Sequence, residues 1–208
     1  MTTDDLKAST EALEIFAPGC ADIPFDIRHR SIIDALPVWG NIKSVLDVGC
    51  GHAPVSRRLQ QMGYMVDALD LEARPGWSIP GGVNFLEEDF MTTDKLKDSY
   101  DVVMCSEVLE HLPNYKEFYA KLLSLASERL IVTIPHEKSF NEFGPPPQGH
   151  CNFWALRHGD ANFTPIAEFL TMSKPYSTSI TKIRTKEKDI DMRQWCFMVV
   201  VDKRQCYG

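Results

Sequence analysis

Residues 46–54 read LDVGCGHAP, and the architecture of the chain can be worked out from this stretch. The apolar run KSVLDVG over 43–49 predicts a buried strand that ends at two glycines. Pro54 suits the first position of the helix that follows, which closes at Gly63. A glycine turn between a strand and a helix N-terminus lets the backbone approach a ligand closely. A dinucleotide fold would use G-x-G-x-x-G, and Pro54 in the third glycine position disfavours it.

Strand and helix patterns alternate along the rest of the chain. Further strands are predicted at YMVDALDLE (64–72), VNFLEEDF (83–90), YDVVMCS (100–106) and RLIVTIP (129–135), with an amphipathic helix over 114–127. Short helices are predicted over 4–16 and 26–36, and another at FTPIAEFLTMS. Two last strands, near 176–186 and 193–202, form a hairpin, so the final strand runs antiparallel to its neighbour. The pattern predicts an α/β fold whose mostly parallel sheet carries helices on both faces.

Composition narrows the class of protein. A chain of 208 residues suits one α/β domain. No apolar run approaches the ~20 residues that cross a bilayer, and the polar start is not a signal peptide. The six cysteines form no CxxC pair, which favours reduced thiols and a cytoplasmic location. The net charge of −7 disfavours a nucleic acid partner. We expect a monomer or a homodimer.

Polar residues follow three of the predicted strands. Asp70 ends the second strand, 21 residues after Gly49, where a carboxylate can accept both hydroxyls of a ribose. Asp89 ends the third strand, where it could meet an adenine amino group, with Phe90 beside the ring. Ser106 ends the fourth. In a parallel sheet these ends share one edge, where ligands bind in a crevice.

Four motifs in order, DVGCG, DALDLE, EEDF and DVVMCSEVLEHL, resemble those of class I S-adenosylmethionine-dependent methyltransferases over about residues 40–137. The resemblance implies a Rossmann-like seven-stranded sheet of order 3-2-1-4-5-7-6, strand 7 antiparallel, and S-adenosylmethionine as cofactor. The implied cofactor-binding residues are Asp47, Gly49, Gly51, Asp70, Leu71, Asp89, Phe90 and Ser106. His52 and Ala53 depart from the usual DVGCGTG, and His52 could contact the carboxylate end of the cofactor.

By the same resemblance, the glycines would pack against the methionine part of the cofactor, and Asp47 would orient its amino acid group. Ser106 would lie near the transferring methyl. Each role has a plainer alternative. Asp47 could be a turn or cap residue, Ser106 could cap the CSEVLEH turn, and Phe90 could belong to the core.

The stretch CSEVLEHLP, residues 105–113, places Glu107, Glu110 and His111 at i, i+3 and i+4, on one face if it is helical. Resemblance to ubiquinone-type O-methyltransferases and small-RNA 2′-O-methyltransferases implies that this face holds a divalent cation, Mg²⁺, Mn²⁺ or Zn²⁺, completed by His150 of QGHCNFW. Such a metal would lower the pKa of an acceptor hydroxyl. In the alternative, Glu107 caps the turn, Glu110 faces solvent and His111 packs beside the fifth strand.

A metal-free site is the other hypothesis. His111 or His150 could then act as general base, since imidazole titrates near neutral pH. His136, directly after IVTIP, is a further candidate, whereas His29 and His158 read as surface or structural residues.

We therefore predict an S-adenosylmethionine-dependent methyltransferase that moves a methyl group to an O or N atom of a small-molecule acceptor. Residues 1–40 would form an N-terminal helical cap and 41–208 the methyltransferase domain, with the loop 136–162 near the acceptor site. The alternatives are a metal-dependent RNA 2′-O-methyltransferase and a non-catalytic S-adenosylmethionine-binding protein.

Overall fold

A computed structural model describes residues 25, 27–37, 42–74, 77, 81–136, 167–184 and 195–206. Its strands are β1 (Ser44–Val48), β2 (Met65–Asp70), β3 (Asn84–Glu87), β4 (Tyr100–Ser106), β5 (Ala126–Pro135), β6 (Tyr176–Arg184) and β7 (Trp195–Cys206). Its helices are α2 (Ile27–Asp34), α3 (Pro54–Gln61), the 3₁₀ helix η2 (Leu109–His111), α4 (Tyr115–Leu125) and α6 (Ala167–Met172). The predicted helix over 4–16 and most of the loop 136–162 lie outside the described residues.

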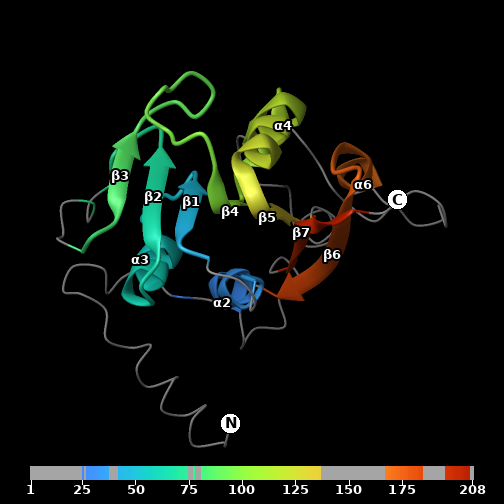
Figure 1. Cartoon of the computed structure of the whole chain (residues 1–208), viewed down its shortest axis with the longest axis horizontal. Helices are drawn as coiled ribbons and strands as arrows, with labels where there is room; N and C mark the ends of the chain where they lie inside the picture. Colours follow the sequence, from blue (N-terminus) through green and yellow to red (C-terminus); the bar gives the residue numbers. More distant parts are fainter. Residues whose placement is uncertain are drawn as a thin grey trace, which may run out of the picture.

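The strands form one sheet of order β3-β2-β1-β4-β5-β7-β6 (Figure 1). The pairs β2–β3, β1–β2, β1–β4 and β4–β5 are parallel, and β7 is antiparallel to both β5 and β6. This confirms the predicted strand order and the antiparallel last strand. The chain reverses direction of winding at β1, so a crevice is expected where the carboxyl ends of β1 and β4 meet.

Helices cover both faces of the sheet (Figure 1). Successive strand residues point to opposite faces, so Val45 and Leu46 of β1 belong to different halves of the core. On the face of Val45, the contacts come from α2 and α3 through Ile32, Val55 and Leu59. On the face of Leu46, they come from α4 and α6 through Phe118, Tyr119, Leu122 and Phe169. In the part of the chain that the structure describes, no helix is long and apolar enough to cross a membrane.

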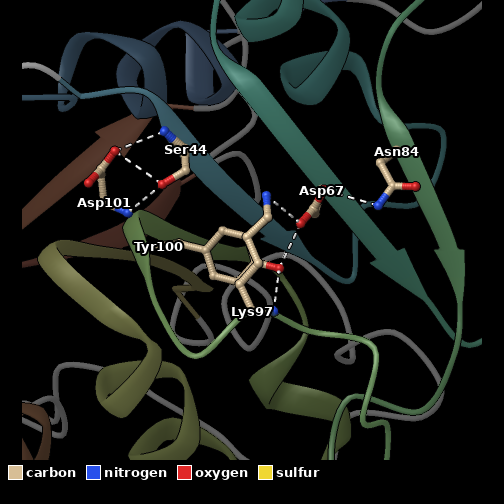
Figure 2. Close-up of polar contacts among 6 residues, drawn as sticks. All are labelled: Ser44, Asp67, Asn84, Lys97, Tyr100 and Asp101. Atoms are coloured by element: carbon tan, nitrogen blue, oxygen red, sulfur yellow. Dashed lines mark hydrogen bonds and ion pairs between the residues drawn. The ribbon is translucent and has the colours of Figure 1, made fainter.

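Two aspartates tie the strands together away from the crevice (Figure 2). Asp101 of β4 accepts the backbone N–H groups of Lys43 and Ser44 at 2.7 and 2.9 Å and the Ser44 hydroxyl at 3.1 Å, which anchors the start of β1. Burial raises the pKa of Asp101, but these hydrogen bonds outweigh it and hold the pKa below its ordinary value.

Asp67 of β2 is the centre of the second cluster. Its carboxylate accepts the Tyr100 hydroxyl at 2.7 Å and the Asn84 amide at 3.1 Å, and lies 3.0 Å from the Lys97 ammonium (Figure 2). The Tyr100 hydroxyl also accepts the backbone N–H of Lys97 at 3.2 Å. Burial raises the pKa of Asp67, yet its three donors bring the net pKa below the ordinary value. This cluster fastens the loop before β4 to the sheet.

We expect Tyr100→Phe to lower the free energy of unfolding by about 1.5–3 kcal/mol, the range for a hydrogen bond to a charged group. Tyr119→Phe is the matched control, because this tyrosine is equally buried but its hydroxyl meets the neutral Ser173 hydroxyl, at 2.7 Å. The control should lose about 0.5–1.5 kcal/mol. Urea unfolding measures both free energies. An equal loss in the two variants would show that a hydrogen bond to the Asp67 carboxylate stabilises the fold no more than one to a neutral hydroxyl.

Candidate active site

The glycine turn connects β1 to α3 across the end of β2. The backbone N–H groups of Gly49 and Cys50 both donate to the Leu69 carbonyl, at 2.8 and 3.0 Å. Gly49 has φ 74° and Gly51 φ 53°, in the left-handed region that favours glycine. Ala53, the N-cap of α3, adopts the same region with φ 58°. The usual motif has a glycine at this position. Alanine departs from it at a cost, because a residue with a Cβ loses roughly 1–2 kcal/mol in the left-handed region.

Asp70 holds the turn from the end of β2. One of its carboxylate oxygens accepts the backbone N–H of Gly51 at 2.8 Å. The next residue, Leu71, has 67% of its surface exposed, an unusual exposure for a leucine. The arrangement fits the prediction that Asp70 takes the ribose hydroxyls and that Leu71 beside it also binds the cofactor. Both roles stay predictions.

Asp70→Ala should weaken binding of S-adenosylhomocysteine by about 1.5–3 kcal/mol, or roughly 10- to 150-fold, because charged hydrogen bonds to the ribose are lost. Calorimetric titration measures this, and Glu72→Ala is the control. Glu72 is an exposed carboxylate two residues away that pairs at 3.6 Å with Arg74. A similar loss of affinity in both variants would contradict the assignment of Asp70.

Trp77 supports the turn from the other side and was missed by the sequence reasoning. Its indole N–H donates to the Gly51 carbonyl at 2.9 Å, and its ring stacks on Phe85 with centroids 4.9 Å apart. No periodicity marks this residue, because it belongs to a connection between strands. Only the folded chain brings it back to residue 51.

The two predicted cofactor residues after β3, Asp89 and Phe90, differ in exposure. Asp89 is exposed, and its carboxylate accepts the backbone N–H of Met91 at 2.8 Å. Phe90 is only 2% exposed and packs on Phe118 with ring centroids 4.6 Å apart. The structure therefore favours the alternative of core packing for the Phe90 side chain over a ring beside adenine.

A cavity of about 350 Å³ lies beside the carboxyl ends of β1 and β4. Three of the predicted cofactor residues line it: Asp47, Gly49 and Ser106. The first turns of α2 add Arg28 and His29. A cavity of this size is at the lower end of those that hold small molecules.

Asp47 is the buried acid of this cavity. It is 6% exposed, and the Ser56 hydroxyl of α3 donates a hydrogen bond to it. Burial raises its pKa from 3.8 to about 7; the charge of Asp70 adds to the rise, and the Ser56 hydrogen bond opposes it. A carboxyl group in this position would bind an ammonium ion strongly, because the cation restores the charge that burial penalises. This agrees with the predicted role of Asp47 at the amino acid group of the cofactor.

Residues 105–113 do not form the helical face that the spacing suggests. Ser106, still in β4, hydrogen-bonds the Thr133 hydroxyl of β5 at 2.8 Å, and Glu107 donates its N–H to the Thr133 carbonyl at 3.0 Å. Glu107 has φ 55°, which turns the chain before η2 begins at Leu109. The helical condition under which Glu107, Glu110 and His111 would share one face is therefore not met.

The three side chains differ in how far they are exposed. Glu107 lines the cavity and its carboxylate lies 3.6 Å from the Arg28 guanidinium. Glu110 is 1% exposed, so the alternative in which it faces solvent is wrong. The His111 side chain is 46% exposed, and its packing beside β5 stays a prediction. Its imidazole lies 3.9 Å from the Glu110 carboxylate and does not border the cavity.

The predicted metal site would combine Glu107, Glu110 and His111 with His150. Within the described residues, no three His, Cys, Asp or Glu side chains come together as metal ligands. His150 lies outside the described residues, so a site that it completes stays a prediction.

Two further histidines, His29 and His136, are buried. His29 is buried on α2, as a structural residue would be, and it also lines the cavity. His136 is 3% exposed and packs on Phe197 of β7, with ring centroids 4.9 Å apart. His158 lies outside the described residues.

A sheet of this order, a glycine turn after β1 held by an acid at the end of β2, and a cavity at the switch point define a class I S-adenosylmethionine-dependent methyltransferase. Residues 26–158 match a family model described as a methyltransferase domain. The chain belongs to this family.

Proteins of similar sequence and structure support this family assignment. The ubiquinone biosynthesis O-methyltransferase of Rickettsia canadensis (strain McKiel) is 35% identical over 186 residues, which are 81% of this chain and 78% of that protein. The magnesium-protoporphyrin O-methyltransferase of Synechocystis sp. is 33% identical over 126 residues, 52% of this chain and 55% of that protein. The crystal structure of magnesium protoporphyrin IX methyltransferase from Synechocystis PCC 6803 with bound SAH has a TM-score of 0.60 at 19% identity, covering 84% of this chain and 81% of that one. That likeness shows the shared fold. The protein is an S-adenosylmethionine-dependent methyltransferase.

Proposed function

We propose that this enzyme methylates a hydroxyl oxygen of a small aromatic acceptor. The cavity beside Asp47 and Ser106 carries the proposal, because apolar side chains such as Ile32 and Met104 line it together with the charged pair of Arg28 and Glu107. Apolar walls with a few polar groups suit an aromatic ring that bears hydroxyls. The relatives from Rickettsia and Synechocystis are both named as O-methyltransferases, which supports oxygen over nitrogen as the methylated atom.

The reaction is an in-line displacement. The acceptor oxygen forms a bond to the methyl carbon, the carbon–sulfur bond breaks, and the sulfur keeps the electron pair to give neutral S-adenosylhomocysteine. The acceptor hydroxyl loses its proton. Holding the two reactants in line supplies a large part of the rate. In this proposal the glycine turn and Asp47 hold the methionine part of the cofactor, Asp70, Leu71 and Asp89 hold the nucleoside, and Ser106 lies near the methyl group.

The test measures S-adenosylhomocysteine release with 3,4-dihydroxybenzoate and catechol, and with aniline analogues of the same size. We expect O-methylated products, identified by mass spectrometry, from the hydroxyl compounds. Transfer confined to the amines would contradict the choice of oxygen. Transfer to the terminal 2′-hydroxyl of a short RNA and to none of the small molecules would favour the RNA enzyme. Binding of the cofactor with no transfer at all would favour the non-catalytic protein.

The same assay with EDTA examines the metal hypothesis. Activity that persists in EDTA would remove the metal site of Glu107, Glu110, His111 and His150. Activity lost in EDTA and restored by Mg²⁺ or Mn²⁺ would support it. The cytoplasmic location, the monomeric or dimeric state, the absence of a nucleic acid partner and the division into 1–40 and 41–208 stay predictions from the sequence.

A further inference from the structure

The backbone N–H groups of the glycine turn, residues 49–53, differ in whether the chain itself satisfies them. Four of the five donate to acceptors within the chain at 2.7–3.0 Å: those of Gly49, Cys50, Gly51 and Ala53. The N–H of His52 has no acceptor among the described residues. It is therefore the N–H that this turn can offer to a ligand without breaking a hydrogen bond of the protein.

Trp77 fixes the peptide group that carries this N–H. Its indole N–H donates at 2.9 Å to the Gly51 carbonyl, which belongs to the same peptide group as the His52 N–H. The peptide bond is trans, so the N–H points away from the carbonyl and away from the indole. Gly51 and Trp77 do not border the cavity, whereas Gly49, Cys50 and His52 do. The indole thus holds one side of the peptide group, and the His52 N–H lies on the other.

The Trp77 side chain has a support of its own. Its ring stacks on Phe85 of β3, with centroids 4.9 Å apart and an angle of 16° between the planes. The two rings pack against Ala53 and Ala68, which are fully buried. Its backbone N–H donates to the Arg74 carbonyl at 3.1 Å, which closes the connection after β2 on itself. The indole can therefore act as a fixed donor to the turn.

The chemistry of the cofactor matches this arrangement. The methionine part of S-adenosylmethionine carries one ammonium group and one carboxylate. The buried carboxyl group of Asp47 suits the ammonium group, so the carboxylate needs a different partner, a hydrogen-bond donor. The His52 N–H lies just before α3, which begins at Pro54, and a helix dipole favours an anion at the N-terminus.

We propose that Trp77 is a positioning residue for the cofactor, which aims the His52 N–H at the carboxylate of the methionine part. The proposal rests on the placement of the methionine part at the glycine turn in the proposed function. Trp77 does not touch the cofactor in this arrangement. It acts through the Gly51 carbonyl, so its effect should be confined to ligands that carry the carboxylate.

The experiment compares two ligands in calorimetric titrations. One is S-adenosylhomocysteine, and the other is S-adenosyl-3-thiopropylamine, which has the same nucleoside, sulfur and ammonium group but no carboxylate. Trp77→Phe keeps a ring that can stack on Phe85 and removes the indole N–H. We expect it to bind S-adenosylhomocysteine about 3- to 10-fold more weakly than wild type, the effect of one hydrogen bond. Its affinity for the decarboxylated analogue should stay within about 2-fold.

Tyr119→Phe is the control, because it also deletes one hydrogen bond of a half-buried or buried aromatic ring, but in α4, away from the turn. Both of its affinities should stay within about 2-fold of wild type. Three results would overturn the proposal: an unchanged affinity of Trp77→Phe for S-adenosylhomocysteine, an equal loss for both ligands, or the same selective loss in Tyr119→Phe. An equal loss would show that Trp77 only maintains the fold of the turn.

A second measurement uses the wild-type protein and decides the matter if Trp77→Phe does not fold. Saturating S-adenosylhomocysteine should slow hydrogen exchange of the His52 amide at least about 10-fold, and the decarboxylated analogue should not. Equal slowing by both ligands, or by neither, would contradict the proposal. Neither measurement uses an acceptor, so a failure here is distinct from a failure of the proposed O-methylation, which the methylated products report.

Discussion

Asp47→Asn should bind S-adenosylhomocysteine at least about 10-fold more weakly than wild type and yet unfold at a higher urea concentration at about pH 8. The loss of affinity follows from the ammonium group of the ligand, which would no longer meet a carboxylate; a hydrogen bond to a charged group contributes about 1.5–3 kcal/mol. The gain in stability follows from burial. Ionised Asp47 is costly in its cavity wall, and asparagine keeps an oxygen that can accept the Ser56 hydrogen bond.

The gain in stability of Asp47→Asn should grow as the pH rises. The pKa of Asp47 rises from 3.8 in the unfolded chain to about 7 in the folded protein, so the folded state binds more protons between these values. The stability that the protonated carboxyl contributes is complete below pH 3.8 and is lost as the pH rises through 7. The advantage of asparagine should therefore be clearly smaller at about pH 5, where much of that stability remains, and reach about 2–4 kcal/mol at about pH 8, since one pKa unit corresponds to about 1.4 kcal/mol.

Asp67→Asn is the matched control for this experiment. Asp67 is also a buried strand aspartate, but its pKa is lowered, because donors from Tyr100, Asn84 and Lys97 outweigh its burial. Its ionised form stabilises the fold above its ordinary pKa, so asparagine should destabilise the protein at neutral pH. Urea unfolding at the two pH values measures both variants. Destabilisation of Asp47→Asn at about pH 8 would show that its carboxyl group is not strained by burial.

The sheet was predictable because each of its signals is local. A strand of four to twelve residues, a glycine turn and an acid at the next strand end can each be read from a short window, and Asp70 and Gly51 do meet at 2.8 Å. The order of the strands came from the resemblance to a family, because hydrophobic patterns do not say which strands are neighbours.

The α2 wall of the cavity was not predictable, because no local pattern in the sequence marks it. His29 and Arg28 sit on a short helix far from the motifs, and nothing in their spacing shows that α2 packs beside the ends of β1 and β4. The error at residues 105–113 has a different cause. The spacing of Glu107, Glu110 and His111 is helical, but Glu107 donates to the Thr133 carbonyl and takes φ 55°, so a contact with β5 overrides the local pattern.

Gly49→Ala should be the most damaging single methyl group in the glycine turn. A Cβ at this position would lie 2.3 Å from Cγ2 of Val108, and φ 74° is already unfavourable for alanine. We expect a loss of about 2–5 kcal/mol in unfolding free energy, from about 1–2 for the left-handed backbone and about 1–3 for overpacking. Gly51→Ala is the matched control, because its φ of 53° is similar but no atom lies within 4 Å of the added Cβ. The control should lose only about 1–2 kcal/mol.

The pair of Gly49 and Val108 also shows what the EVLEH stretch does in this fold. Val108 follows Glu107 directly and fills the space over the glycine turn. Any change in the turn therefore has to be matched by a shift of the residues after β4. Val108→Ala should relieve the clash, and the double variant should lose at least about 1 kcal/mol less than the sum of the two single variants. Strict additivity would show that Val108 moves away freely. In that case the EVLEH stretch would not help to set the shape of the cofactor turn, and its two glutamates and histidine would have to be explained by the acceptor side alone.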